Sequence, residues 1–303
     1  DYCLLLKGKI VAVIEAKKTS RGAEVGREQA RQYAHNIKDY MQPNEPLPFI
    51  FYTNGHDIWF WDEDGGYPPR KVYGYPTKDD LEYFGFRRNE KLPLDTIKVN
   101  TEISGRYYQI DAIQNITESL TQKRREALLV MATGTGKTRT AVGLVDVLMR
   151  ARWAKRVLFL VDRIALRDQA LSAFKEHLNE PSVWPKPGEY KFPHDRRIYV
   201  QTYPTMLNKI SEDEYLSPHF FDLIIADEAH RSLFHIYKQV MDHFDCFKIG
   251  LTATPREQVH RSSFKLFDCR DNMPTYDYTY EEAAALAEAI LNNTDIVDET
   301  SLF

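Results

Sequence analysis

The fold is decided by the stretch Leu128-Leu129-Val130-Met131-Ala132-Thr133-Gly134-Thr135-Gly136-Lys137-Thr138. Its apolar start predicts a buried strand, its glycines predict a tight turn, and a helix is expected to begin after them. Backbone N–H groups in such a turn converge on phosphate oxygens, and the dipole of the following helix favours negative charge. The stretch therefore predicts a phosphate-binding loop. The loop residues are Thr133, Gly134, Thr135, Gly136, Lys137 and Thr138.

The chemistry expected at this loop is the binding of a nucleoside triphosphate. The Lys137 ammonium would lie at the β- and γ-phosphates, and the Thr138 hydroxyl would ligate Mg²⁺. Met131 stands where the strict GxxxxGK[ST] pattern has its first glycine, so the match is to a looser form of the pattern. A chance Gly-Thr-Gly-Lys-Thr in an ordinary loop is the alternative.

A second motif weakens the alternative of a chance match. It reads Leu223-Ile224-Ile225-Ala226-Asp227-Glu228-Ala229-His230. It is an apolar strand that ends in two adjacent carboxylates. Asp227 is suited to hold the Mg²⁺ ion that bridges the phosphates, and Glu228 is suited to orient and deprotonate the attacking water. Together the two motifs predict ATP hydrolysis.

The pattern around these motifs indicates an α/β fold. Apolar runs alternate with helix-compatible segments after residue 107, which favours a parallel sheet covered on both faces. The expected strands are 127–131, 157–161, 198–201, 223–226 and 248–251. Residues 62–105 are rich in Gly, Pro, Tyr and charge, so we place a domain boundary near residue 95 and expect domains over 1–95 and 96–303.

The first domain is predicted to be a compact α/β unit that opens with a hairpin. Glu15 and Lys17 are two apart on a strand, so their side chains leave the same face. If Lys7-Gly8-Lys9 is a three-residue loop, Leu6 pairs with Ile10 and Asp1 lies opposite Glu15. A two-residue loop would place Asp1 opposite Ala16 instead.

Asp1 and Glu15 on one face would form a Mg²⁺ site, with Lys17 placed to position water and offset phosphate charge. This is the chemistry of phosphodiester hydrolysis. A lone Glu-x-Lys also occurs on surface strands for solubility, which is the alternative. The apolar character of the strand and the nucleotide-binding segment that follows favour the metal site.

The Gly-Thr-Gly-Lys-Thr and Asp-Glu-Ala-His motifs resemble those of superfamily 2 helicases and translocases of the DEAH type, whose core is a RecA-like domain. Residues 106–113 resemble the adenine-reading Q motif, in which Gln109 would bind the base. The resemblance also implies DNA-backbone contacts at Arg163 and Thr202, although a solvated charge is the alternative for Arg163. Residues 250–255 resemble motif III, which links hydrolysis to DNA; His230 would join that link or be a buried structural histidine.

The Asp1, Glu15 and Lys17 arrangement resembles the PD-(D/E)xK nuclease fold. Gln29 and Tyr33, one helical turn apart, match the QxxxY element of its helicase-linked members and would reach metal-bound water or DNA. Thr53-Asn54-Gly55 either belongs to this group or is a plain Asn-Gly hairpin turn.

The order of these motifs is most similar to the restriction (motor and nuclease) subunit of type I restriction enzymes. The resemblance implies ATP and Mg²⁺ as cofactors, double-stranded DNA as substrate, and methyltransferase and specificity subunits as partners. It implies that DNA is translocated with ATP and then cleaved. The alternatives are a stand-alone or type III-like helicase-nuclease in DNA defence or repair, and a non-cleaving ATP-gated DNA-binding module.

Composition sets the remaining expectations. With 303 residues and 43% hydrophobic content the chain can bury a core, and no apolar run is long enough to span a membrane, so a cytoplasmic location is expected. Cys3, Cys246 and Cys269 suggest neither disulfides nor zinc. The net charge of -4 does not decide for or against nucleic acid. The chain starts at Asp1 and ends soon after motif III, so we expect a fragment without the start of the nuclease domain or the second RecA-like domain, and with poor ATP hydrolysis by itself.

Overall fold

The computed structural model describes residues 1–178, 183–186, 191–211, 216–227, 234–253 and 261–292. The chain divides into two compact units. Unit 1 comprises Asp1–Leu92, Tyr203–Asp222 and His235–Cys246, and unit 2 comprises Pro93–Thr202, Leu223–Phe234 and Phe247–Phe303. Unit 1 is therefore discontinuous along the chain, and the single boundary expected near residue 95 stays a prediction.

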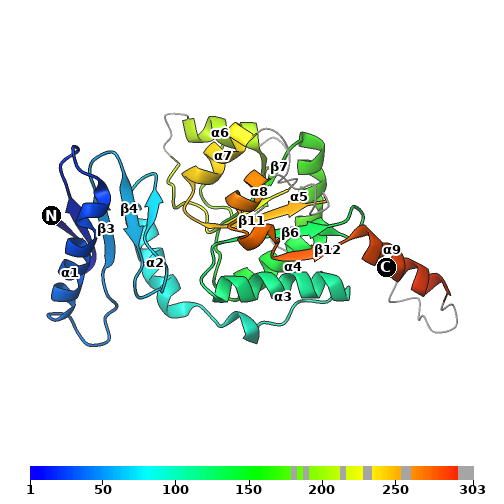
Figure 1. The fold of residues 1–303 in the computed structure, drawn as a ribbon, viewed down its shortest axis with the longest axis horizontal. Helices are drawn as coiled ribbons and strands as arrows, with labels where there is room; N and C mark the ends of the chain where they lie inside the picture. Colours follow the sequence, from blue (N-terminus) through cyan, green and yellow to red (C-terminus); the bar gives the residue numbers. More distant parts are fainter. Residues whose placement is uncertain (179–182, 187–190, 212–215, 228–233, 254–260, 293–303) are drawn as a thin grey trace. The chain divides into compact units, whose positions relative to one another are not determined.

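Unit 1 is built on a five-stranded sheet with the strand order β1-β2-β3-β4-β5. The strands are β1 (Tyr2–Leu6), β2 (Lys9–Ala16), β3 (Phe49–Thr53), β4 (Ile58–Trp61) and β5 (Arg70–Val72). Strands β2 and β3 are parallel, and the other pairs are antiparallel. Helices α1 (Arg27–Lys38) and α2 (Lys78–Glu90) lie on either side of this sheet (Figure 1).

Two hydrophobic clusters cover the two faces of this sheet because side chains alternate along each strand. Phe49 and Phe51 pack with Leu81 and Phe84 of α2 on one face. The other face packs against Ala30 and Ala34 of α1, and its strand residues include Val13, Ile50 and Tyr52. Since Glu15 is two residues after Val13, it belongs to the face that α1 covers.

The first hairpin differs from the expectation in its turn. Leu6 pairs with Lys9, so the loop is the two-residue Lys7-Gly8, and the expected three-residue loop is wrong. Both loop residues have positive φ (52° and 80°), as a tight hairpin turn requires. A bulge between Leu4 and Leu5 then shifts the register, so that Tyr2 pairs with Ile14. The next pair in this register would join Asp1 to Glu15, which is the pairing that the longer loop was expected to produce.

Unit 2 is built on a parallel sheet of seven strands, as the alternating pattern predicts. Their order is β12-β6-β11-β10-β7-β9-β8, and every pairing is parallel. The strands are β6 (Glu126–Met131), β7 (Val157–Val161), β8 (Val183–Trp184), β9 (Ile198–Thr202), β10 (Leu223–Ala226), β11 (Phe247–Thr252) and β12 (Tyr276–Tyr278). The five longest are almost wholly buried, which explains their continuous apolar sequence.

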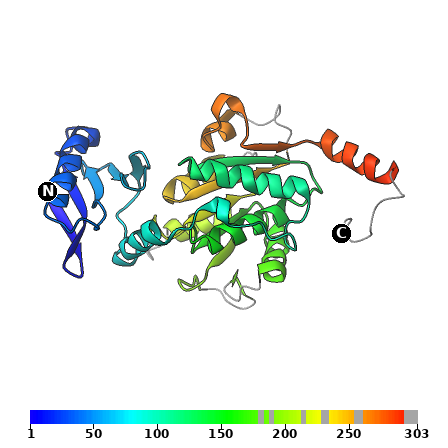
Figure 2. The same cartoon turned by 90° about the horizontal axis from the view of Figure 1, so that it is seen from below.

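The helices of unit 2 include α3 (Tyr107–Thr121), α4 (Lys137–Arg150), α5 (Ile164–Leu178), α8 (Arg261–Leu266) and α9 (Tyr280–Asn292). Helices α3 and α4 pack side by side (Figures 1 and 2). Gly143 of α4 permits this packing, because a Cβ there would lie 2.3 Å from Ser104 Oγ and 3.0 Å from Ile113 Cδ1. The remaining helices are α6 (Tyr203–Ser211) and α7 (Phe234–His243).

Within the described ranges, no helix combines the length and apolar character needed to cross a bilayer. Cys3, Cys246 and Cys269 are free thiols in this structure.

Candidate functional site

The glycine loop lies between the end of β6 at Met131 and the start of α4 at Lys137. Gly134 and Gly136 have φ values of +83° and +84°, a left-handed conformation that side chains disfavour. The Thr135 hydroxyl donates to Ala132 O at 2.7 Å and closes the turn. Thr133 and Gly134 are exposed, so the outer part of the loop is open to a ligand. The geometry suits phosphate at the N-terminus of α4.

Gln109 of α3 lies directly against this loop. Its side-chain amide donates to Thr135 O at 3.1 Å, and its side chain is buried at 2% exposure. A Cβ on Gly136 would lie 2.6 Å from Gln109 Nε2, so the second glycine of the loop also makes room for this amide. The structure thus brings Gln109 to the phosphate loop, while its contact with adenine stays a prediction.

Asp227 follows β10, and the glycine loop follows β6, so both lie at the C-terminal end of the parallel strands. Strand β11 lies between β6 and β10, and Leu128, Gly250 and Ala226 are aligned across the three parallel strands. Two strand spacings separate β6 from β10 by about 10 Å. The C-terminal end of the sheet therefore carries Lys137, Thr138 and Asp227. Glu228, His230, Thr254 and Pro255 lie outside the described residues.

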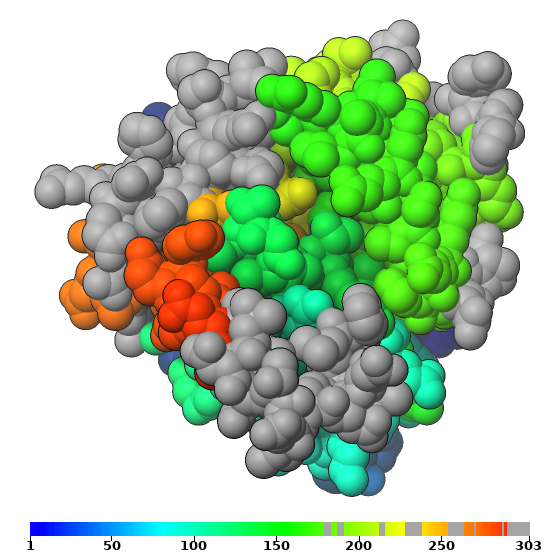
Figure 3. Space-filling view, turned by 90° about the vertical axis from the view of Figure 1, so that its right-hand side faces the viewer, coloured from blue at the N-terminus to red at the C-terminus, as the bar shows by residue number. Residues whose placement is uncertain are grey.

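The two candidate DNA contacts differ in their exposure. Arg163 precedes α5, and its side chain is 71% exposed with Nε 3.7 Å from Asp162 Oδ2. The outer side of α5 forms part of the surface in Figure 3, in bright green. Thr202 pairs with Val161 at the end of β9 but is only 7% exposed. Of the two, only Arg163 is open to a DNA phosphate in this structure.

Four candidate nuclease residues form one hydrogen-bonded chain on the α1 face of the five-stranded sheet. The Lys17 ammonium donates to Glu15 Oε1 and, at 2.5 Å, to Gln29 Oε1. Gln29 Nε2 in turn lies 2.6 Å from the Tyr33 hydroxyl and donates to it. The residues come from β2, the segment after it, and one face of α1. The spacing of Gln29 and Tyr33 by one helical turn is what allows this last bond.

The Glu15 carboxylate has the character of a cation ligand. Its side chain is 1% exposed, and Oε2 has no hydrogen-bond partner among the described residues. A buried carboxylate oxygen without a partner is costly unless a cation binds it, and Mg²⁺ prefers oxygen ligands. Asp1 and Tyr33 both line a cavity of about 310 Å³ beside these hydrogen-bonded side chains. No cluster of three or more His, Cys, Asp or Glu occurs in the described part of the chain.

Gly26, which no sequence motif indicated, lies immediately before α1 and against the Glu15–Lys17 pair. A Cβ at Gly26 would lie 3.1 Å from Glu15 Cγ and 3.3 Å from Lys17 Cγ. Its φ of -84° needs no glycine, so only the close approach explains the residue. The sequence carries no signal for such a contact, because the two segments meet only in the folded unit.

Tyr52 is a second residue that the sequence did not single out. It pairs with Glu15 across β2 and β3, stacks on Trp59 at 5.9 Å, and is 1% exposed. Burial raises the pKa of the Tyr52 hydroxyl to about 12, so it stays protonated at neutral pH.

The Thr53-Asn54-Gly55 segment acts in this structure as a turn. Asn54 Oδ1 accepts from the backbone N–H groups of His56 and Asp57, and Asn54 Nδ2 donates to Arg21 O. Gly55 has a φ of +89°. These contacts support the plain hairpin-turn alternative.

Two family models match the chain. Residues 102–257, more than half of the chain, match the model described as "Type III restriction enzyme, res subunit". Residues 1–68 match the model described as "Type I restriction enzyme R protein N terminus". The first match covers the glycine loop and Asp227, and the second covers Glu15, Lys17, Gln29 and Tyr33.

Similar proteins include two endonuclease subunits of type I restriction enzymes. The EcoKI subunit of Escherichia coli K12 is 28% identical over 93% of this chain and 29% of its own length. The EcoAI subunit of Escherichia coli is 31% identical over 90% of this chain and 34% of its own length. The chain thus spans about a third of these curated relatives. A solved fragment described as an HsdR subunit of a type I enzyme from Vibrio vulnificus is 29% identical, with a TM-score of 0.48, over 89% of this chain and 47% of that one.

Proposed function

We propose a function from the premise that this chain belongs to the restriction-enzyme family described as the type III restriction enzyme res subunit. Its first 68 residues match the type I R protein instead, and it is similar to type I endonuclease subunits over most of its length. We therefore propose that it is the restriction subunit of a type I enzyme. In this function it translocates double-stranded DNA with ATP and cleaves it with Mg²⁺.

The ATPase part of the proposal rests on the placement of the glycine loop and Asp227 at the same, C-terminal end of the parallel strands. The glycine loop would hold the phosphates through backbone N–H groups, and Lys137 would add positive charge there. Thr138 and Asp227 would hold Mg²⁺, and Glu228 would deprotonate the attacking water. When bound, Mg²⁺ neutralises charge that develops on the phosphates. Gln109 would keep the loop in shape through its bond to Thr135 O and would contact the adenine.

The nuclease part rests on the hydrogen bonds that connect the side chains of Glu15, Lys17, Gln29 and Tyr33. Glu15 and Asp1 would bind a Mg²⁺ ion, which polarises a phosphodiester and its attacking water. Lys17 is held between Glu15 and Gln29, and its ammonium would orient water and stabilise charge on the leaving oxygen. Tyr33 fixes the Gln29 amide and borders the cavity at Asp1.

The DNA and the partner subunits complete the proposal. Arg163 would contact phosphates of the tracked duplex, and such contacts are independent of sequence, as a moving enzyme requires. Recognition of the target site would come from a specificity subunit, with a methyltransferase subunit in the same complex. One observation carries the whole proposal: the same polypeptide contains two candidate sites. The first is the set of side chains hydrogen-bonded around Lys17. The second is the glycine loop, which lies with Asp227 at the C-terminal end of the parallel strands.

The test is cleavage of circular DNA by the protein assembled with methyltransferase and specificity subunits, in ATP and Mg²⁺. Lys137→Ala should abolish ATP hydrolysis and ATP-dependent cleavage, because the phosphates lose their fixed cation. Glu15→Gln should abolish cleavage and leave DNA-stimulated ATP hydrolysis intact. Unchanged ATP turnover in the first variant, or undiminished cleavage in the second, would refute the assignment of that site.

A type III-like enzyme is the second candidate, favoured by the description of the family model that covers residues 102–257. Such an enzyme would bring its own target recognition. Cleavage by the protein without added type I subunits would favour this candidate. A complex that hydrolyses ATP and never cuts DNA would favour the non-cleaving module.

A further inference from the structure

The segment that follows β2 carries three positively charged side chains next to the candidate nuclease residues. They are Lys17, Lys18 and Arg21. The Lys17 ammonium binds Glu15. Lys18 and Arg21 are exposed, and their side chains form neither an ion pair nor a hydrogen bond within the part of the chain that the structure describes. Both cations are therefore open to a ligand.

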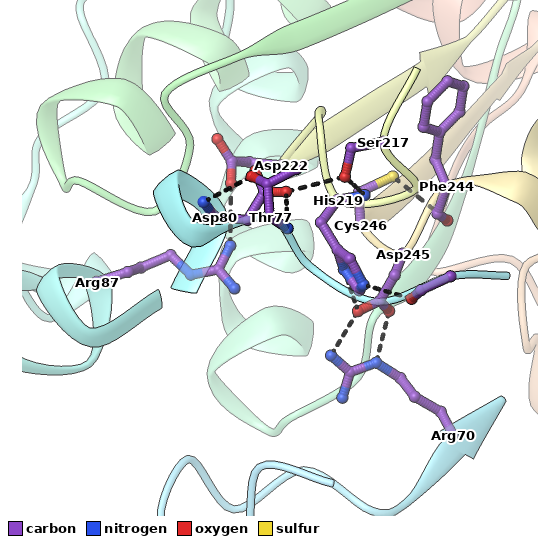
Figure 4. A network of polar contacts seen from close by, with 11 residues as sticks. Arg70, Thr77, Asp80, Arg87, Ser217, His219, Asp222, Phe244, Asp245 and Cys246 are labelled. Carbon is purple, nitrogen blue, oxygen red and sulfur yellow. Dashed lines mark hydrogen bonds and ion pairs between the residues drawn. The ribbon is translucent and has the colours of Figure 1, made fainter. Parts of the chain in front are cut away.

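Most other basic side chains of unit 1 have an acidic partner, and two of these ion pairs are largely buried. Arg70 donates through Nε and Nη2 to the two carboxylate oxygens of Asp245, at 2.5 and 2.8 Å. Arg87 Nη1 of α2 donates to Asp222 Oδ1 at 3.1 Å. Figure 4 shows both ion pairs in one buried network, which also contains Asp80, Ser217 and His219.

More exposed cations of this unit pair with carboxylates as well. These pairs are Lys7–Glu82, Lys9–Glu45, Arg31–Glu63 and Lys71–Asp57. Lys18 and Arg21 lack such a partner in the described ranges, and Lys17 adds a third cation beside them. Like charges that are held close together repel, so this group favours a polyanion. Beside a candidate site for phosphodiester hydrolysis, the polyanion that fits is a DNA backbone.

The backbone of this segment is held by the turn that follows β3. Lys17 N donates to Thr53 O at 2.8 Å, and Asn54 Nδ2 donates to Arg21 O at 3.0 Å. Arg21 N donates to Lys18 O at 2.9 Å, which closes a β-turn. The Cα atoms at the two ends of such a turn lie less than about 7 Å apart. The two free cations therefore start from neighbouring points of a fixed loop.

The place of this loop in unit 1 gives it a use. Lys18 directly follows Lys17, whose ammonium binds the buried carboxylate of Glu15. A strand of DNA bound by the loop would therefore pass beside Glu15 Oε2, the atom without a protein partner. A loop that is already fixed loses little freedom when a ligand binds, so it binds more tightly than a loose one with the same charges.

We infer that Lys18 and Arg21 bind the DNA backbone next to the phosphate that is cleaved, and that Asn54 holds their loop in place. The inference rests on the proposed function, to which it adds the DNA contacts of unit 1. These contacts are made to phosphate oxygens, so they carry no preference for a base sequence. The Thr53-Asn54-Gly55 segment thereby acquires a role beyond its own hairpin turn.

The experiment measures binding of a short DNA duplex by the 303-residue chain without ATP, with Ca²⁺ in place of Mg²⁺, over a range of salt concentrations. All proteins carry Arg163→Gln, so that the candidate contact of unit 2 does not mask the change. Lys18→Gln and Arg21→Gln should each lower the slope of log Kd against log salt concentration by about 0.9, because each lost phosphate contact releases fewer counterions. The double variant should lower the slope by about 1.8.

Asn54→Ser separates the position of the loop from its charge. Serine keeps an oxygen that can accept from the N–H groups of the turn, but it loses the amide that donates to Arg21 O. Both cations remain, so the slope should stay the same while Kd rises about fivefold. The matched control is Lys78→Gln at the start of α2, on the other side of the sheet. Lys78 is likewise exposed and unpaired in the described residues, and its replacement should change neither quantity.

Each other outcome has a definite meaning. An unchanged slope in the double variant overturns the inference, and so does an equal fall of the slope in the Lys78→Gln control. An unchanged Kd in folded Asn54→Ser protein overturns the role of Asn54. If that variant does not fold, the exposed Lys18 and Arg21 variants still decide the phosphate contacts. Cleavage by the assembled enzyme is a separate measurement: a fall of the slope without any cleavage by the unaltered enzyme refutes the proposed function and leaves the DNA contacts standing.

Discussion

At the scale of single residues, Lys17 is the centre of the nuclease candidate. Its ammonium binds a carboxylate that is 1% exposed and an amide oxygen of α1. A buried carboxylate needs such a partner, since an unpaired charge in the interior is strongly unfavourable. The same pairing leaves one oxygen of Glu15 without a protein partner. Lys17 therefore compensates the buried charge of Glu15, and under the proposed function Glu15 Oε2 would be the atom that binds the cation.

Gly26→Ala tests how tightly the Glu15–Lys17 pair is held. The added Cβ would crowd Glu15 and Lys17 at 3.1 and 3.3 Å, so both side chains must move by a few tenths of an ångström. Displaced catalytic groups lose rate steeply, and we expect Mg²⁺-dependent cleavage to fall about tenfold, with ATP hydrolysis unchanged. Initial rates of cleavage and of phosphate release measure the two effects.

Gly22→Ala is the matched control for that variant. Gly22 lies four residues earlier and has open space where a Cβ would be added. Its cleavage rate should equal that of the unaltered protein. Equal rates in both variants would mean that the close approach of Gly26 has no role in positioning Glu15 and Lys17.

At the scale of elements, the start of α2 is fixed by a capping box that also takes part in the buried network. Asp80 N donates to Thr77 Oγ1 at 3.2 Å, and Thr77 N donates to Asp80 Oδ2 at 2.9 Å. The same Asp80 oxygen accepts from Ser217 Oγ. The cap therefore holds the helix that carries Arg87, and it also binds a segment from elsewhere in the sequence.

Thr77→Ala should destabilise α2 by about 1 kcal/mol, the usual effect of losing an N-cap side chain. Faster amide hydrogen exchange in Lys78–Glu90 would report the change. Thr96→Ala is the control, because the exposed Thr96 hydroxyl only donates to Pro93 O. Protection of α2 that is equal in both variants would contradict the structural role of the cap.

At the scale of the whole molecule, the folding unit and the continuous chain segment do not coincide. Unit 1 takes in Tyr203–Asp222 and His235–Cys246 besides the first 92 residues. The inserted residues supply His219, whose ring lies 5.4 Å from Phe84 and 6.1 Å from Phe60, and the carboxylate partners of Arg70 and Arg87. A first domain of 1–95 would lack all of these contacts.

We therefore expect a polypeptide of residues 1–95 to lack a cooperative thermal transition and to bind a hydrophobic dye. The reason is that its α2 face would expose Phe60 and Phe84 and leave two arginines without their carboxylates. Near-ultraviolet circular dichroism and dye fluorescence, with the 303-residue chain as control, measure this. A sharp transition without dye binding would show that residues 203–246 are dispensable and would support a boundary near 95.

The local elements could be predicted from the sequence. Apolar runs of strand length predicted the parallel strands. The glycines before Lys137 predicted a turn, and they have φ values of +83° and +84°, a conformation that favours glycine. The two-residue spacing of Glu15 and Lys17, and the four-residue spacing of Gln29 and Tyr33, put these side chains on common faces. Such features follow from the fixed periods of strands and helices, which any reader of the sequence can apply.

How distant segments meet could not be predicted and is seen in the folded chain alone. The bulge in β1 set the register of the first hairpin, and Gly26 approached Glu15 because α1 packs on that face of the sheet. The pairing of Arg70 with Asp245 joins residues 175 apart along the chain. Contacts of this kind have no period and no local sequence pattern, because burial and packing of the whole unit select them from many pairings of similar chemistry.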